Sequence, residues 1–131
     1  MYDNEKRTLN AGLIGALFGF LAVALGAFGA HGLEGRLSPG DLATFETAVR
    51  YQMYHALALI LLGTTAARLP SVRVRAAGWA FATGILVFSG SLYLLVLTGH
   101  RWLGAVTPLG GVAFLVGWGA LAAAFMRRDH A

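Results

Sequence analysis

Residues 76–98 read AAGWAFATGILVFSGSLYLLVLT and contain neither a charged residue nor a histidine. A helix rises ~1.5 Å per residue, so about 20 apolar residues cross a hydrocarbon layer of about 30 Å. A helix also satisfies its own backbone hydrogen bonds, as a segment in contact with lipid must. This stretch therefore predicts a membrane-spanning helix.

Three further stretches have comparable length. Leu9–Ala30 and Trp102–Met126 are uncharged, whereas Val49–Leu69 contains Arg50, His55 and Arg68. We expect an all-α integral membrane protein, an up-down four-helix bundle that forms a single transmembrane domain over residues 1–131. The expected helices are about 9–30, 39–69 with 49–69 in the hydrocarbon, 72–98 and 102–126.

The composition supports a membrane class. Only 12% of the residues are charged and 57% are hydrophobic, whereas a soluble domain carries about 25% charged residues to keep its surface wetted. The chain has no cysteine, which excludes disulfides, thiolate metal ligands and a cysteine nucleophile. The formal net charge of +4 is not arranged as a basic stripe with interleaved aromatics, so we expect no nucleic-acid partner.

Helix ends can be read from local signals. Ser38-Pro39-Gly40-Asp41 predicts a capping box, with Ser38 as N-cap, Pro39 at the first helical position and Asp41 reaching back. The second helix then overshoots the hydrocarbon. Leu69-Pro70-Ser71 predicts a stop and a new N-cap, and Gly99 suits the end of the third helix. Pro108-Leu109-Gly110-Gly111 predicts a kink or a loosened first turn in the fourth.

The distribution of Lys and Arg predicts orientation, because these residues favour the cytoplasmic side. Seven fall at one end of the expected bundle (Lys6, Arg7, Arg68, Arg73, Arg75, Arg127 and Arg128) and three at the other (Arg36, Arg50 and Arg101). We therefore expect a multi-pass protein of the cell inner (plasma) membrane with both termini cytoplasmic. The first apolar run is twenty-two residues, longer than the about 7–15 of a signal peptide, so we expect it to be retained.

Polar residues within the expected spans form a candidate site, because such groups are costly in lipid. His55 is the strongest, and helix depth places others near its level in the outer half of the bundle. The candidate cluster is His31, Glu46, Arg50, Gln52, His55, Ser89, Ser91 and Tyr93. Two interpretations stay open: a ligand or transport site, or hydrogen bonding between helices, with Glu46 and Arg50 paired in the headgroup region.

No catalytic site is predicted. Phe88-Ser89-Gly90-Ser91 does not match the Gly-x-Ser-Gly of intramembrane serine proteases, and no nucleophile–base pair is recognisable. His31 and His100 are conceivable haem ligands, but both lie at expected helix ends beside glycines. We expect no enzyme, no cofactor and no metal site.

Small residues predict close helix contacts. Gly15 and Gly19 form a small-xxx-small pair that Gly26 extends along the first helix, and Gly117 lies on a similar face of the fourth. Small residues let helix backbones approach in lipid. We expect these glycines to pack helices within the bundle, with packing between copies as the alternative.

Four motifs occur in order along the chain: Gly26-Ala27-Phe28-Gly29-Ala30-His31, Tyr51-Gln52 with His55, Phe88-Ser89-Gly90-Ser91-Leu92-Tyr93, and Thr107-Pro108-Leu109-Gly110-Gly111. In these, the chain resembles domain-of-unknown-function family 423, small four-helix inner-membrane proteins of bacteria with eukaryotic relatives called transmembrane protein 256. The resemblance covers nearly the whole chain. It implies a membrane location and four helices, and it carries over no catalytic residue because the family has no established activity.

Three classes of function remain open. The first is a non-enzymatic accessory or assembly subunit of a larger membrane complex, which suits a small chain without a sizeable domain outside the lipid. The second is a small oligomeric transporter or channel that uses the polar cluster around His55. The third is a lipid-, quinone- or haem-binding protein. The expected partners are the lipid bilayer, together with subunits of a membrane complex or further copies of this chain.

Overall fold

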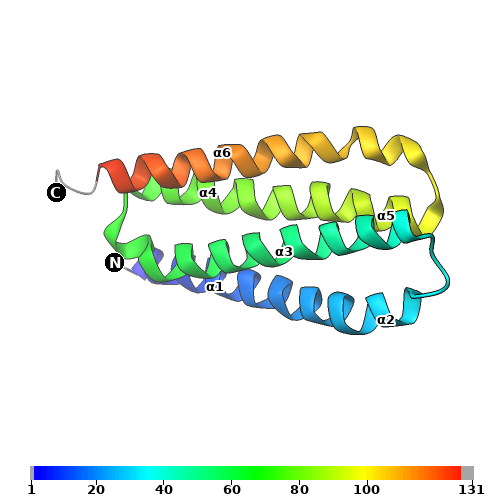
Figure 1. Cartoon of the computed structure of the whole chain (residues 1–131). Helices are drawn as coiled ribbons and strands as arrows, with labels where there is room; N and C mark the ends of the chain where they lie inside the picture. Colours follow the sequence, from blue (N-terminus) through cyan, green and yellow to red (C-terminus); the bar gives the residue numbers. More distant parts are fainter. Residues whose placement is uncertain (1, 128–131) are drawn as a thin grey trace.

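The computed structural model describes residues 2–127, with side chains for residues 10–29 and 31–127. Within this range the regular structure is all helical, and four helical rods follow one another in antiparallel order (Figure 1). The rods are α1 (Tyr2–Val23) with η1 (Ala24–Gly29) and α2 (Ala30–Leu33); α3 (Pro39–Thr65) with η2 (Ala66–Arg68); α4 (Ser71–Gly84) with η3 (Ile85–Ser89) and α5 (Gly90–Thr98); and η4 (Arg101–Ala105) with α6 (Thr107–Met126).

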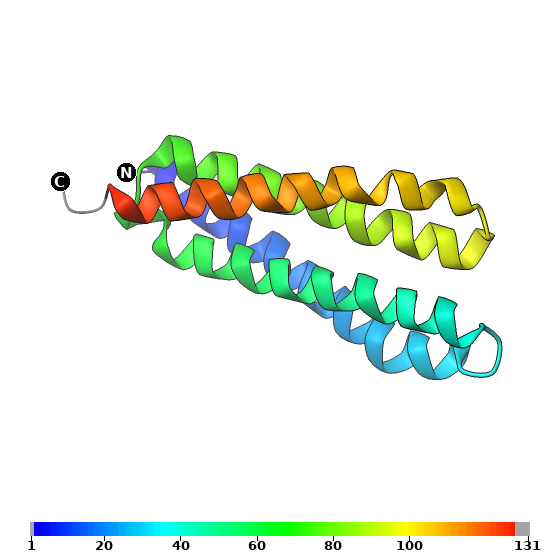
Figure 2. The same ribbon diagram turned by 45° about the horizontal axis from the view of Figure 1, so that its top comes forward.

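The rods associate as two pairs. α1 packs along α3, α4 packs along α6, and α3 also contacts α4, η3 and α5; Figure 2 shows the two pairs side by side. The beginning of α1, the hairpin at η2 and the end of α6 lie at one end of the bundle (Figure 1). We call this the terminal end, and the opposite end, with the α2–α3 and α5–η4 connections, the loop end.

The hydrophobic core lies where α3 faces α4 and α6. Leu59, Leu62 and Phe81 are each no more than 1% exposed, and Phe114 from α6 joins their cluster. A second cluster near the loop end centres on Phe45. α3 therefore contributes to both clusters.

The helix ends largely follow the local signals. Ser38 Oγ accepts a hydrogen bond from the Asp41 backbone N–H at 3.1 Å, and Pro39 stands in the first turn, which confirms the predicted N-cap. Gly99 ends α5 with a φ of 76°, a conformation that glycine adopts without strain. The predicted N-cap at Ser71 is wrong, since Ser71 is itself helical and Pro70 precedes the helix.

Two rods contain a π-helical turn that the sequence did not predict, at η1 and η3. A π-turn accommodates an extra residue per turn and rotates the faces of the helix on either side. The first rod also extends over 2–33 rather than 9–30. The fourth starts as the 3-10 turn η4, with Pro108 at the beginning of α6, in line with the expected loosened first turn.

Three of the described helices are long and apolar enough to cross a membrane: Asn10–Leu33, Ser71–Thr98 and Arg101–Met126. α3 is not among them. Arg50, Gln52 and His55 lower its hydropathy. The fourth span therefore stays a prediction.

Candidate functional site

Gln52 is the centre of a buried polar group in the loop-end half of the bundle. Its side chain is 3% exposed. Its amide Nε2 donates to the Phe18 carbonyl oxygen of α1 at 2.8 Å, and its Oε1 accepts from the Tyr93 hydroxyl of α5 at 2.7 Å. One side chain of α3 thus joins three helical rods.

Ser89 supplies a second link to α3. It closes the π-turn η3 and is 1% exposed. Its hydroxyl donates to the Ala48 carbonyl oxygen at 2.7 Å. Because Ala48 and Gln52 lie one turn apart on α3, the Ser89 and Tyr93 contacts fasten α3 to the third rod at adjacent levels.

Ser91 connects the third and fourth rods. Its hydroxyl lies 2.6 Å from the Thr107 hydroxyl and donates to the Phe88 carbonyl oxygen at 3.0 Å. The Thr107 hydroxyl also has an acceptor of its own, the Leu103 carbonyl oxygen at 3.3 Å, so either hydroxyl can be the donor in the Ser91–Thr107 contact. Thr107 was not among the predicted site residues, although its place in the Thr-Pro-Leu-Gly-Gly motif was a signal.

His55 lies one turn further along α3 and is 4% exposed. Its Nε2 accepts from the indole N–H of Trp118 at 3.1 Å, so that nitrogen carries no proton. Its Nδ1 lies 2.6 Å from the Tyr51 carbonyl oxygen and must be the donor there. The network therefore assigns a neutral imidazole with its proton on Nδ1.

Aromatic rings enclose His55. Its ring stacks on Phe114, with centroids 3.5 Å apart and planes 7° from parallel, and Trp118 meets it edge-on. Sequence reasoning missed both partners. Phe114 and Trp118 are four residues apart on α6 and so share one face of that helix, which was the available signal.

His31, Glu46 and Arg50 do not join the buried group. His31 Nδ1 lies 3.9 Å from a Glu34 carboxylate oxygen, and these side chains are 86% and 72% exposed. Arg50 and Glu46 approach to 3.9 Å on the outer face of α3. The candidate cluster thus divides into five side chains that line the bundle interior and three on its surface.

The interior group is fully paired. Among the residues whose side chains are described, no buried side-chain nitrogen or oxygen lacks a hydrogen-bond partner, and no three His, Cys, Asp or Glu residues gather as a metal site. Interhelical hydrogen bonds in membrane proteins each contribute about 0.6 kcal/mol on average. The hydrogen bonds of this interior group connect the four rods to one another.

Three of the four predicted packing glycines lie at close helix contacts. A Cβ at Gly15 would lie 2.7 Å from the Ala56 carbonyl oxygen, one at Gly26 would lie 2.9 Å from Val49 Cγ1, and one at Gly117 would lie 2.6 Å from the Phe81 ring. Gly19 makes only ordinary contacts.

Two glycines outside the prediction are packed more tightly. A Cβ at Gly84 would overlap the Phe114 ring, and one at Gly110 would overlap the Phe88 backbone. Both positions lie where α6 meets the third rod. Their tightness follows from the close approach of these two consecutive rods.

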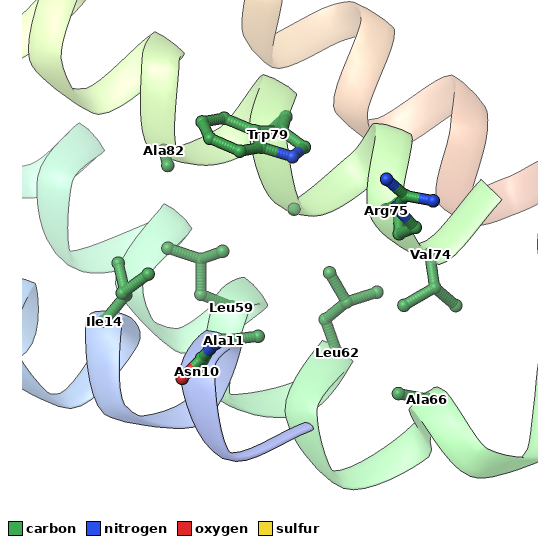
Figure 3. A pocket seen from close by; sticks show the side chains of 11 residues that line it. Asn10, Ala11, Ile14, Leu59, Leu62, Ala66, Val74, Arg75, Trp79 and Ala82 are labelled. Atoms are coloured by element: carbon green, nitrogen blue, oxygen red, sulfur yellow. The ribbon is translucent and has the colours of Figure 1, made fainter. Parts of the chain in front are cut away.

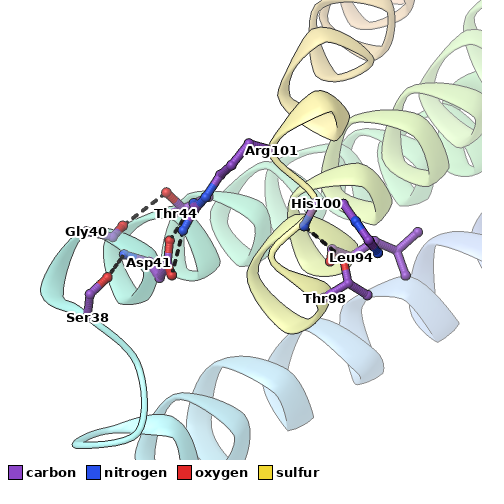
Figure 4. A network of polar contacts seen from close by, with 8 residues as sticks. All are labelled: Ser38, Gly40, Asp41, Thr44, Leu94, Thr98, His100 and Arg101. Carbon is purple, nitrogen blue, oxygen red and sulfur yellow. Dashed lines mark hydrogen bonds and ion pairs between the residues drawn. The ribbon is translucent and has the colours of Figure 1, made fainter.

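An ion pair closes the loop end. Arg101 donates to both carboxylate oxygens of Asp41 at 2.9 and 3.2 Å, which joins the start of α3 to η4 (Figure 4). The Asp41 carboxylate thus bonds across the bundle to η4. The Arg101 hydrogen bonds hold the pKa of Asp41 below its usual value.

Residues 25–111 match the family described as "Protein of unknown function (DUF423)". The chain belongs to this family. The four motifs that carried the resemblance lie within the matched residues, as do Gln52, Ser89 and Tyr93. The DUF423 match therefore includes these side chains of the buried polar group but not their partners Phe18 and Trp118, and the family has no assigned activity.

Curated relatives are similar to about four fifths of this DUF423 chain. A UPF0382 membrane protein of Staphylococcus aureus is 51% identical over 106 residues, which cover 81% of this chain and 86% of the relative. The UPF0382 membrane protein YwdK of Bacillus subtilis is 50% identical over 107 residues, 81% of this chain and 87% of the relative. No solved structure matches. The chain is a membrane protein of a family whose function is unknown.

Proposed function

We propose that this protein crosses the plasma membrane four times, with both ends in the cytoplasm, and acts as a non-enzymatic accessory or assembly subunit of a larger membrane complex. The observation that carries the proposal is the closed pairing of the buried polar side chains. The side chains of Gln52, Ser89 and His55 form hydrogen bonds with other helices or with the backbone of their own helix. A group used in this way serves helix association rather than a substrate.

The outer surface supports the same proposal. Large apolar side chains are exposed on every rod, among them Phe28 at 78%, Leu57 at 57%, Leu97 at 63% and Leu115 at 72%. In a membrane such faces meet lipid or the helices of other subunits. A small bundle with apolar flanks offers several faces for docking against partner helices.

The distribution of polar residues on α3 favours a fourth span. Gln52 and His55 face the interior, whereas Leu57 and Leu61 are exposed. Polar residues in a membrane helix are tolerated where they face the bundle and find partners. α3 can therefore cross the bilayer although its hydropathy is lower than that of the other rods.

Native mass spectrometry tests the assembly role. The tagged protein is extracted gently from its own membranes, and an unrelated four-span protein with the same tag serves as the control. We expect heterologous subunits at a fixed ratio that are absent from the control. Recovery of the chain alone would overturn the accessory role, and recovery only as a homo-oligomer would overturn it and favour the transport class.

A further inference from the structure

A groove runs between α1 and α4 at the terminal end of the bundle (Figure 3). Its volume is about 450 Å³, within the ~300–1,000 Å³ range of ligand sites. Leu59 and Leu62 of α3 form its floor, and each is 1% exposed. The groove lies between the α1–α3 pair and the α4–α6 pair, above the buried side chains of α3.

The walls are mostly apolar. Ala11 and Ile14 come from α1, and Val74, Gly78 and Ala82 come from α4. Gly78 has no side chain to fill the groove above Leu62. A Cβ on residue 78 would lie 3.4 Å from Leu62 Cδ2. A narrow apolar groove on the flank of a membrane bundle suits a hydrocarbon chain.

The rim of the groove is polar on the α4 side. Arg75 and Trp79 both line it, four residues apart on α4, and Trp79 is 74% exposed. Trp prefers the level of the lipid headgroups. Arg75 therefore lies where a headgroup would sit when an acyl chain occupies the groove.

The charge of the chain is concentrated at this end. Among residues 2–127, the terminal end holds six Lys and Arg against two Asp and Glu by sequence position, whereas the loop end holds three of each. The entire formal net charge of +4 thus belongs to the terminal end. Basic pockets between membrane helices on the cytoplasmic side bind anionic lipid headgroups.

We propose that this groove binds one anionic phospholipid, with an acyl chain against Leu59 and Leu62 and the phosphate beside Arg75. The site is separate from the polar group around Gln52, which lies in the other half of the bundle. The inference rests on the bilayer placement proposed above. The phospholipid would occupy a face of the bundle that does not contribute to the polar interior.

The test measures lipid retention by native mass spectrometry. The protein is released from nanodiscs that contain equal parts of phosphatidylglycerol and phosphatidylcholine. Wild type should retain one phosphatidylglycerol per chain in preference to phosphatidylcholine. Gly78→Leu, which fills the groove, should lose that adduct, and Arg75→Gln should weaken the preference about fivefold, as expected for one basic residue near a headgroup.

Two matched variants serve as controls. Gly119→Leu adds the same side chain to α6, where a Cβ would meet nothing within 4 Å, and Arg36→Gln removes a charge at the loop end. Both should retain phosphatidylglycerol like wild type. Equal retention of the two lipids by wild type, an unchanged adduct in Gly78→Leu, or loss in Gly119→Leu would overturn the site. Failure of wild type to enter nanodiscs at all would instead overturn the bilayer placement.

Discussion

Single side chains of α3 determine how the rods meet. Gln52 uses a donor and an acceptor of its amide to reach partners 34 and 41 residues away in sequence. His55 uses both ring nitrogens, and Ser89 returns a hydrogen bond to α3 from the third rod. Lipid offers no hydrogen-bonding partner, so each of these contacts satisfies a polar group that would otherwise need water. These residues therefore specify which helix faces pack together.

The Gln52–Tyr93 contact can be measured with a double-mutant cycle. We expect Gln52→Leu and Tyr93→Phe each to lower the free energy of unfolding in detergent, and their effects to be non-additive because they remove the same hydrogen bond. The coupling should be about 0.6 kcal/mol and no more than ~1.7. Thr64→Val is the control, since Thr64 bonds only to its own helix. Additive effects would contradict the contact.

The tautomer of His55 provides a second prediction. Nitrogen-15 NMR of selectively labelled protein at neutral pH should show a protonated Nδ1 and an unprotonated Nε2. Trp118→Phe removes the N–H that faces Nε2 and should shift that nitrogen resonance most. Trp102→Phe is the control because Trp102 lies in η4, away from His55. A proton on Nε2 in wild type would contradict the network.

The Asp41–Arg101 pair predicts a pH dependence. The pKa of Asp41 is lowered in the folded protein by the Arg101 hydrogen bonds, from a usual value of 3.8. A lowered carboxyl pKa stabilises the fold above the unfolded pKa, and this contribution is lost as pH falls through the folded pKa. Asp41→Asn should therefore lower the Tm at neutral pH, and the difference should vanish in acid.

Glu46→Gln is the control for this prediction, because Glu46 approaches Arg50 only to 3.9 Å at an exposed position. Added salt should also reduce the effect of Asp41→Asn, since exposed charges are screened. A Tm difference that persists unchanged below the folded pKa would show that Asp41 acts through helix packing rather than charge.

At the scale of elements, α3 and the contact between α6 and the third rod carry most of the packing. α3 holds nine buried residues, which include both polar and apolar side chains. The π-turn η3 brings Ser89 towards α3, while Gly84 and Gly110 bring the third rod and α6 close together. The third rod thus bonds to α3 on one side and packs tightly on α6 on the other.

Adjacent glycines of α6 test this close contact. Gly110→Ala should lower the free energy of unfolding by about 1–3 kcal/mol, because its Cβ would overlap the Phe88 backbone. Gly111→Ala should leave stability unchanged or raise it by less than ~1 kcal/mol, since nothing lies within 4 Å of that Cβ and alanine favours helix. Thermal unfolding in one detergent compares the two. Equal effects would contradict the packing.

At the scale of the whole molecule, charge and shape differ between the two ends of the bundle. The terminal end is basic and carries the groove, whereas the loop end is balanced in charge and closed by the Asp41–Arg101 pair. A bundle of this kind should take one orientation in the membrane, because excess Lys and Arg resist translocation.

Orientation can be tested with single cysteines, since the chain has none of its own. A maleimide that does not cross membranes should label Glu34→Cys in intact cells but label Ala67→Cys only after the membrane is opened. Both positions are exposed, and they lie at opposite ends of the bundle. The reverse pattern would place the termini outside, and labelling of both in intact cells would contradict a membrane-spanning α3.

The sequence by itself determined the helical class, the membrane setting, the helix ends at Ser38 and Gly99, and the family. These follow from hydropathy and turn chemistry, which act within a few residues along the chain. Only the tertiary structure decided that Gln52 bonds to Phe18 and Tyr93, that His55 meets Phe114 and Trp118, and that Glu46 and Arg50 stay on the surface. The reason is that those contacts depend on helix rotation, and the π-turns and glycine approaches that set rotation arise only when the rods pack.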